Sequence, residues 1–313
     1  MTAPSDQRPA TITPIREIRR ALLAWHRRAG MHAPWRDSGD PYHALVAAVM
    51  AQQTQMSRVM PCYERFVAAY PTVDALAAAS RGGVIRTWAG MGYNQRAVRL
   101  HNAARIIAAH GWPRDAGALA RIDGIGPFTA AIVASFAFGA PAACVDTNVR
   151  RVLGRLAGDE TIAGSRLQAL ANEALARRSP ARWNQALMDY GARVCVPRPR
   201  CGECVLAAWC PSRDRYAAPA QLTVAEQRAR YGARPRRAKP EAPFEGSPRY
   251  FRGRIVEVLR GLPPGASVPL RRLPALIANG QPAPDAAATR ALVQALERAG
   301  LAVVRGSGVS LPE

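Results

Sequence analysis

The apolar positions of this chain recur at helical spacing over most of the residues before position 215. Between Ile15 and Ala29, Ile18 and Leu22 share one face with arginines between them, which predicts an amphipathic helix. Polar or turn-forming residues separate further helices, expected at residues 42–51, 56–69, 73–79, 84–89, 94–110, 145–156, 165–176 and 181–192, and an apolar segment at 131–145. Because few runs alternate between apolar and polar residues, the pattern predicts an all-α main body.

The pattern changes after the main body. Residues 213–248 are rich in Pro, Arg and Ala and predict a basic linker, in which only residues 224–231 suit a short helix. Beyond it we expect a helix, a short strand, two helices and a terminal hairpin around Gly306-Ser307-Gly308, an order typical of a winged-helix-like module at 249–313. DNA contact and packing against the body or a partner both remain open as its role.

Two interruptions of the helical pattern carry polar side chains. Residues 52–55 read Gln-Gln-Thr-Gln, a poor choice for a core and a reasonable one for a surface that meets bases. Residues 90–94, Gly-Met-Gly-Tyr-Asn, predict a tight turn. On the helix that follows, Arg96, Arg99 and Arg105 are expected on the polar side.

Charge indicates the class of partner. The chain has 43 Lys and Arg against 22 Asp and Glu, a formal net charge of +21, and arginine is spread along its whole length. This excess implies a polyanion, most simply nucleic acid. No run of eighteen apolar residues occurs and the first residues are polar, so we expect a soluble, cytoplasmic protein that makes no membrane contact.

Four of the six cysteines lie close together, at Cys195, Cys201, Cys204 and Cys210. Without a secretion signal, such a cluster indicates a metal or iron–sulfur site rather than disulfides. The other two cysteines, Cys62 and Cys144, lie in apolar helical surroundings and are expected to be buried and inert.

A phosphate site and a carboxylate are predicted within residues 122–152. Gly124 and Gly126 flank one apolar residue between helical patterns, a turn that leaves backbone N–H groups free to bind a phosphate at a helix start. Asp146 opens the next helix. Each has a plainer interpretation: the glycines as a simple helix connection, and Asp146 as an N-cap without chemistry.

The motifs together resemble the helix-hairpin-helix DNA glycosylases, most closely the MutY type and next endonuclease III. The resemblance rests on Pro34-Trp35, residues 49–55, the Gly90–Tyr93 turn, Gly124-Ile125-Gly126, residues 145–152 and the four clustered cysteines, and it covers residues 14 to about 212 in unbroken order. It implies a two-lobed fold with a six-helix lobe at about 38–146 and an iron–sulfur lobe formed by 14–37 and 147–212, after a disordered N-terminus at 1–13.

The resemblance also implies roles for single residues. Gln53 and Tyr93 fall where side chains wedge into opened DNA, and Trp35 near the pocket for the extruded base. Gly124 and Gly126 carry the phosphate-gripping hairpin, and Asp146 matches the catalytic aspartate, which stabilises the positive sugar formed as the base leaves. The four cysteines match a [4Fe–4S] loop, although the interval between Cys195 and Cys201 is one residue shorter than usual; a structural zinc site is the alternative.

This chain departs from the family's pattern at four places. Ala48 stands where MutY has the glutamate that protonates adenine, and no other carboxylate lies between Tyr42 and Tyr63. Phe128 stands where endonuclease III has its Schiff-base lysine, and Lys239, in the linker, is the only lysine of the chain. The module after the linker is too short for the Nudix-like domain of MutY proteins. Asp123, where the hairpin usually has proline, should weaken the phosphate site slightly.

These observations predict a monofunctional DNA base glycosylase of base excision repair, without lysine-based lyase activity. Its partner is expected to be double-stranded DNA containing a lesion or mismatch, bound by a monomer associated with the nucleoid. Adenine excision is doubtful, and uracil or thymine in a mismatch or an alkylated base is open as substrate. Two alternatives are a catalytically silent lesion-binding protein and a winged-helix regulator with an iron–sulfur sensor.

Overall fold

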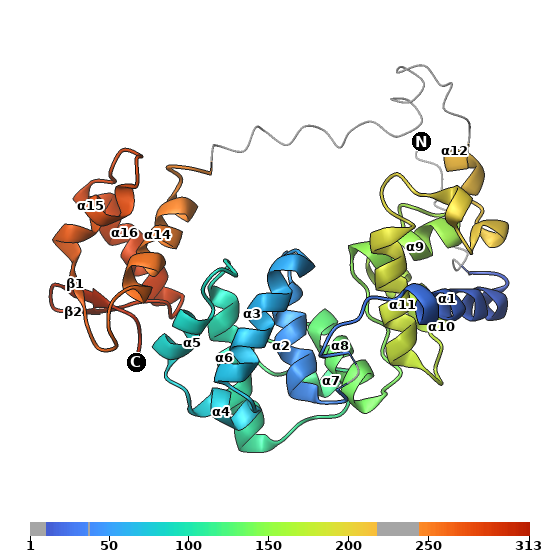
Figure 1. Ribbon diagram of the computed structural model, residues 1–313, viewed down its shortest axis with the longest axis horizontal. Coiled ribbons are helices and arrows are strands. Elements are labelled where there is room, and N and C mark those ends of the chain that lie inside the picture. Colours follow the sequence, from blue (N-terminus) through green and yellow to red (C-terminus); the bar gives the residue numbers. More distant parts are fainter. Residues whose placement is uncertain (1–10, 37, 218–243) are drawn as a thin grey trace, which may run out of the picture. The chain divides into compact units, whose positions relative to one another are not determined.

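The computed structural model describes residues 11–36, 38–217 and 244–313 (Figure 1). Of the N-terminus predicted to be disordered at 1–13, the first ten residues lie outside the described residues, and Ile12 is 5% exposed and belongs to a buried apolar cluster. Most of the predicted linker, including the short helix at 224–231, also lies outside the described residues. The helices before residue 218 are α1 (Ile15–Ala29), α2 (Pro41–Ala51), α3 (Met56–Ala69), α4 (Val73–Ala78), α5 (Arg81–Thr87), α6 (Gln95–His110), α7 (Ala116–Leu119), α8 (Pro127–Phe138), α9 (Thr147–Leu156), α10 (Gly164–Ala174), α11 (Pro180–Arg193), η1 (Cys201–Glu203), η2 (Ala207–Trp209) and α12 (Arg213–Ala217). The predicted all-α main body is therefore confirmed for these residues.

The differences from the predicted elements have local causes. Helix α5 begins three residues earlier than predicted because the Ser80 side chain accepts a hydrogen bond from the Gly83 N–H and caps it. Of the predicted apolar segment 131–145 only the first part is helical, since α8 ends at Gly139 in the left-handed conformation, with φ of 64°. The short helix α7 was not predicted.

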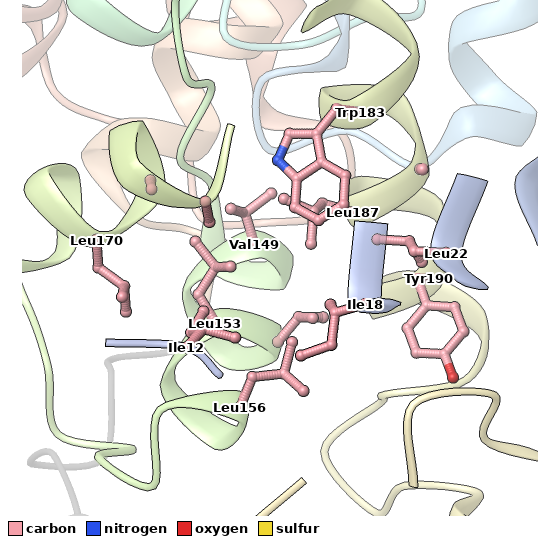
Figure 2. Close-up of a cluster of buried hydrophobic side chains, with 14 of the residues drawn as sticks. Ile12, Ile18, Leu22, Val149, Leu153, Leu156, Leu170, Trp183, Leu187 and Tyr190 are labelled. Atoms are coloured by element: carbon pink, nitrogen blue, oxygen red, sulfur yellow. The ribbon is translucent and has the colours of Figure 1, made fainter. Parts of the chain in front are cut away.

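The chain forms two compact units. Unit 1 comprises Met1–Leu45, Pro113–Ala120 and Gly126–Ala233, and unit 2 comprises Val46–Trp112, Arg121–Ile125 and Arg234–Glu313. In unit 1, helices α1, α9, α10 and α11 enclose one apolar core, and Figure 2 shows side chains of all four meeting there. Helix α11 is central to it, because it packs against both α1 and α9. Its Trp183 and Tyr190 are each only 1% exposed.

The C-terminal module lies in unit 2. Its elements are α14 (Pro248–Arg260), β1 (Val268–Pro269), η3 (Leu270–Arg272), α15 (Leu273–Ala278), α16 (Ala286–Arg298), β2 (Val303–Arg305) and β3 (Gly308–Ser310). The strands form an antiparallel sheet in the order β1-β3-β2, with Val309 of β3 opposite both Val268 and Val304. The helix, strand, two helices and hairpin thus follow the predicted order.

The module shares a core with the helices of residues 46–112. Ile85 of α5 and Val98 of α6 belong to the same buried cluster as Ile255 and Val256 of α14. At the end of α14, Arg260 donates hydrogen bonds to the Ile85 carbonyl at 2.8 Å and to the Asn94 side chain at 2.8 Å. Burial lowers the pKa of Arg260 to about 10, an effect that Glu257 partly offsets. The module is therefore packed onto α5 and α6 rather than only tethered to them.

Candidate functional site

Asp146 is the N-cap of α9. Its Oδ1 accepts a hydrogen bond from the Val149 N–H at 2.7 Å, and its Oδ2 accepts one from the Asn148 side chain at 3.1 Å. The side chain is half-buried. The structure thus confirms the capping role that the sequence left open, and a capped carboxylate is also a carboxylate held in one orientation.

Helix α11 positions this helix start. The buried Asn184 accepts a hydrogen bond from the Cys144 N–H at 3.1 Å and donates to the Ala142 carbonyl at 2.8 Å, which fixes the segment leading into Asp146. At Gly191 a Cβ would lie 2.6 Å from Cβ of Asn148, so only glycine lets α11 approach α9 this closely. Sequence reasoning missed both residues, because nothing in their own surroundings distinguishes them.

The turn before α8 depends on one of its two glycines. Gly124 has φ of 90°, and a Cβ there would lie 2.7 Å from the Arg99 carbonyl oxygen, so a side chain is excluded. Gly126 is the N-cap of α8, with Pro127 in the first turn. A Cβ at Gly126 would meet nothing within 4 Å, so this position has room for a side chain. Because Pro127 has no N–H, Phe128 and Thr129 carry the backbone N–H groups of the first turn of α8.

Gln53 and Tyr93, the two predicted wedge residues, have left-handed backbones. Their φ angles are 53° and 44°, and the one other residue besides glycine with positive φ among those described is Asn279. Such a conformation costs a non-glycine residue roughly 1 kcal/mol or more and persists only where the surroundings impose it. Tyr93 is 48% exposed and Gln53 is exposed.

Arg96 joins the two loops that carry these residues, and the prediction that it lies on the polar side of its helix is wrong. It is 6% exposed. Its guanidinium donates to the carbonyls of Val49, Met50, Gln52, Met91 and Gly92 and to the Thr54 hydroxyl, at 2.5 to 3.4 Å. Burial lowers the pKa of Arg96, partly offset by Tyr93. One cation thus ties residues 49–54 to residues 91–92, around both left-handed positions.

The other residues predicted to form the base pocket are described unit by unit. In unit 1, Trp35 is 6% exposed and Phe128 is half-buried in the first turn of α8. The loop of Trp35 is fixed by Asp189, whose oxygens each accept from Arg36 at 2.7 Å. Burial alone would raise the pKa of Asp189, but Arg36 and His26 lower it well below its usual value. In unit 2, Ala48 is buried within α2.

The four clustered cysteines line one small pocket. Two of their sulfurs receive hydrogen bonds: Tyr190 donates to Sγ of Cys204 at 3.0 Å, and Arg155 donates to Sγ of Cys195 at 3.4 Å. Burial raises the pKa of the Cys210 thiol to about 11. Across the described ranges, no three His, Cys, Asp or Glu side chains form a group tight enough for a single metal ion.

The other two thiols lie apart from this pocket. Cys62 is 7% exposed and Cys144 is 1% exposed, so their predicted burial is confirmed. Burial raises the pKa of Cys144 strongly, with a smaller contribution from Asp146. A thiol whose ionised form is this unfavourable is unreactive at neutral pH.

A helical body with a glycine turn before α8, a capped aspartate and a four-cysteine loop defines a class of DNA repair protein, and comparison with known proteins agrees. The model of a family described as "HhH-GPD superfamily base excision DNA repair protein" matches residues 46–177. "Adenine DNA glycosylase" of Mycobacterium tuberculosis (strain ATCC 25618 / H37Rv) is 38% identical over 249 residues, 76% of this chain and 77% of that protein. The chain therefore belongs to the HhH-GPD superfamily, as a MutY-type member.

More distant proteins show the same fold. "Adenine DNA glycosylase" of Homo sapiens is 34% identical over 222 residues, which cover 65% of this chain and 41% of the human protein. A solved "thermostable thymine-DNA glycosylase" matches with a TM-score of 0.61 and 27% identity, over 64% of this chain and 97% of that one. A trapped endonuclease III–DNA intermediate matches with a TM-score of 0.57 and 22% identity, over 66% and 100%. None of the helices in the described parts of this chain is long and apolar enough to span a membrane.

Proposed function

We propose that this protein is a monofunctional DNA glycosylase of base excision repair, which takes a mismatched or damaged base out of the duplex and hydrolyses its N-glycosidic bond. The observation that carries the proposal is Asp146, a carboxylate held at the start of α9 in a chain of this superfamily. Extrusion is required because the glycosidic bond is not reachable inside the stack.

Asp146 acts on the sugar in this proposal. As the bond between C1′ and the base nitrogen breaks, the electron pair leaves with the base and the sugar becomes positive. The carboxylate stabilises that charge, and water then adds at C1′. An anion fixed against a developing cation in a site that excludes water lowers a barrier by several kcal/mol. The backbone N–H groups of Gly124 and Gly126 would hold a phosphate, since that of Ile125 already bonds to the Ile122 carbonyl and Pro127 has none.

The substrate follows from Ala48, which stands where the MutY pattern has its glutamate. Ala48 has no acidic group that could donate a proton, so adenine would have to leave without the acid that the MutY route uses. Bases that leave readily as anions, such as uracil or mismatched thymine, or alkylated purines that already carry positive charge, need no such acid. Phe128 forms no imine, which supports a monofunctional enzyme.

A panel of duplexes tests the proposal, with adenine opposite oxidised guanine, uracil or thymine opposite guanine, or an alkylated purine. We expect strand cleavage only after alkali, at uracil, thymine or the alkylated purine, and little at adenine. A48E, which adds back a carboxyl group, is expected to gain adenine release. Cleavage without alkali would contradict monofunctional action, and release of no base at all would contradict the enzyme.

A catalytically silent lesion-binding protein is the second candidate. It is favoured by the fact that both oxygens of Asp146 already accept hydrogen bonds at the start of α9. This candidate requires tight binding to one duplex of the panel and cleavage of none.

We further propose a [4Fe–4S] cluster bound by Cys195, Cys201, Cys204 and Cys210. The residues fit such a group: four thiols line one pocket, and Tyr190 and Arg155 donate hydrogen bonds to two of the sulfurs. Four thiolates suit a [4Fe–4S] cluster or a structural zinc ion, and the match of these cysteines to the family's iron–sulfur loop favours the cluster. When bound, the cluster would fix the loop bearing Arg198 and Arg200 without taking part in base release.

Replacing a cluster ligand should bleach the protein. C204S is expected to lose nearly all of the absorption near 400 nm that an iron–sulfur cluster gives. C62S, with its thiol buried elsewhere, should keep it. Visible spectra of the two purified variants decide this; a colourless wild type with stoichiometric zinc would contradict the cluster.

The module at 249–313 is proposed to be a winged-helix domain, on the basis of its element order and its three-stranded sheet. The partner is proposed to be double-stranded DNA with a lesion or mismatch, bound by a monomer in the nucleoid. The formal charge of +21 supports this partner, since phosphate contacts dominate such affinity.

A further inference from the structure

The exposed ring of Tyr93 has an arginine of the C-terminal module over it. Cζ of Arg249, in the first turn of α14, lies 4.7 Å from the centroid of the Tyr93 ring. Cζ of Arg96, from the buried side of the loop, lies 5.4 Å from the same centroid. Tyr93 is therefore held by two guanidinium groups that come from parts of the chain about 150 residues apart.

This contact follows from how α14 docks. Arg249, Val256 and Arg260 lie on one face of the helix, because seven and eleven residues correspond to about two and three turns. Val256 is fully buried in the cluster with Ile85 and Val98, and Arg260 bonds to Asn94, the residue after Tyr93. The contacts of Val256 and Arg260 therefore fix the face of α14 that carries Arg249, and this places the Arg249 side chain over the Tyr93 ring.

Phe244 extends the same surface. Its ring centroid lies 5.8 Å from Cζ of Arg249 and 5.7 Å from the Tyr250 ring. Phe244 and Tyr93 are 58% and 48% exposed, and with Leu276 they are the exposed large apolar side chains among the described residues. Arg249 is exposed as well. Two open rings with a planar cation between them form a stacking surface, here called the Tyr93–Arg249–Phe244 surface.

We propose that the Tyr93–Arg249–Phe244 surface binds an unstacked nucleobase of opened DNA, so that the C-terminal module takes part in recognising the lesion. Aromatic rings and guanidinium planes are the groups on which unstacked bases stack, and the positive charge suits the adjacent phosphates. The inference rests on the proposed function, since it assigns a partner surface to the loop that carries the proposed wedge. It adds residues from outside the part of the chain that the superfamily model matches.

The test compares two labelled duplexes, one fully paired and one with a stable abasic site opposite guanine, whose guanine is left unpaired. We expect R249A to weaken binding of the abasic duplex about tenfold, the value of one lost base stack, and to weaken binding of the paired duplex much less. R252A removes the same charge from an exposed position one turn further along α14 and should change both affinities equally. Equilibrium titrations of the full-length variants give these ratios.

Three results would overturn the inference. R249A behaving like R252A on both duplexes would leave Arg249 with general charge only. R249K restoring full binding would assign the residue to a phosphate, because lysine keeps the charge but lacks the stacking plane. A loss of thermal stability in R249A with equal weakening of both duplexes would make the contact structural. If wild-type protein shows no preference for the abasic duplex, the proposed function fails too, whereas an intact preference that R249A does not alter removes this inference alone.

Discussion

The D146N variant is expected to release bases about 10³-fold more slowly than the wild type while remaining folded and bound to DNA. The loss follows from removing the negative charge that the proposal places against the sugar cation. The fold survives because asparagine is as good an N-cap as aspartate, so the bond from the Val149 N–H is kept. The bond from Asn148 is lost, at a cost of about 1 kcal/mol. Single-turnover rates on the preferred duplex measure the effect.

Asp115 provides the matched control. It is the N-cap of α7, and its Oδ1 accepts from the Ala118 N–H at 2.8 Å, as Asp146 does at α9. D115N should leave both the rate and the affinity unchanged. If D146N keeps the wild-type rate, Asp146 only caps its helix and the proposed catalytic role is wrong. If no base is released by either protein, the lesion-binding candidate is supported instead.

The R96M variant is expected to be less stable than the wild type by about 3–5 kcal/mol, the summed cost of leaving several buried carbonyls without a hydrogen-bond donor. Methionine fills part of the space but donates no hydrogen bond, so the carbonyls of Val49, Met50 and Met91 lose their partner inside the protein. Gln53 and Tyr93 would then be free to leave their left-handed conformations. Urea unfolding followed by circular dichroism measures the change.

Arg99 separates this effect from the loss of a positive charge. It lies on the same helix, three residues along and exposed, so R99M should change stability by no more than roughly 0.5 kcal/mol. R96K keeps the charge but replaces a planar fork with a single ammonium group, and should recover only part of the loss. Equal stability of R96M and R99M would mean that water replaces the guanidinium at little cost.

Arg96 illustrates how far the sequence could be followed. Its helix places residues 96, 100, 103, 104 and 107 on one face, and all of them are buried. The spacing of Arg96 with these apolar residues indicated burial. The prediction placed it on the polar face because arginine is so rarely buried. The partners that make its burial favourable are carbonyls at the end of α2 and in the turn after it, more than forty residues away, and carbonyls four or five residues before it.

Asp146 illustrates the other limit. The sequence predicted a carboxylate at a helix start, which the structure confirms, but its catalytic role stays a prediction because a cap and a catalyst require the same residue at that place. The cap itself is a local hydrogen bond from the Val149 N–H, whereas the position of the helix start depends on Asn184 and Gly191 of α11.

The sequence by itself determined the all-α main body, the element order of the C-terminal module, the grouping of four cysteines and the family, because helical periodicity, turn residues and short motifs are encoded by neighbours along the chain. Tertiary structure alone decided that Arg96 is buried between two strained loops, that Asn184 and Gly191 position Asp146, and that Arg249 lies over Tyr93. All three features depend on contacts between segments that are distant in the sequence. The positions of the backbone acceptors and the docking of the helices determine these contacts, and no local sequence pattern predicts either of them.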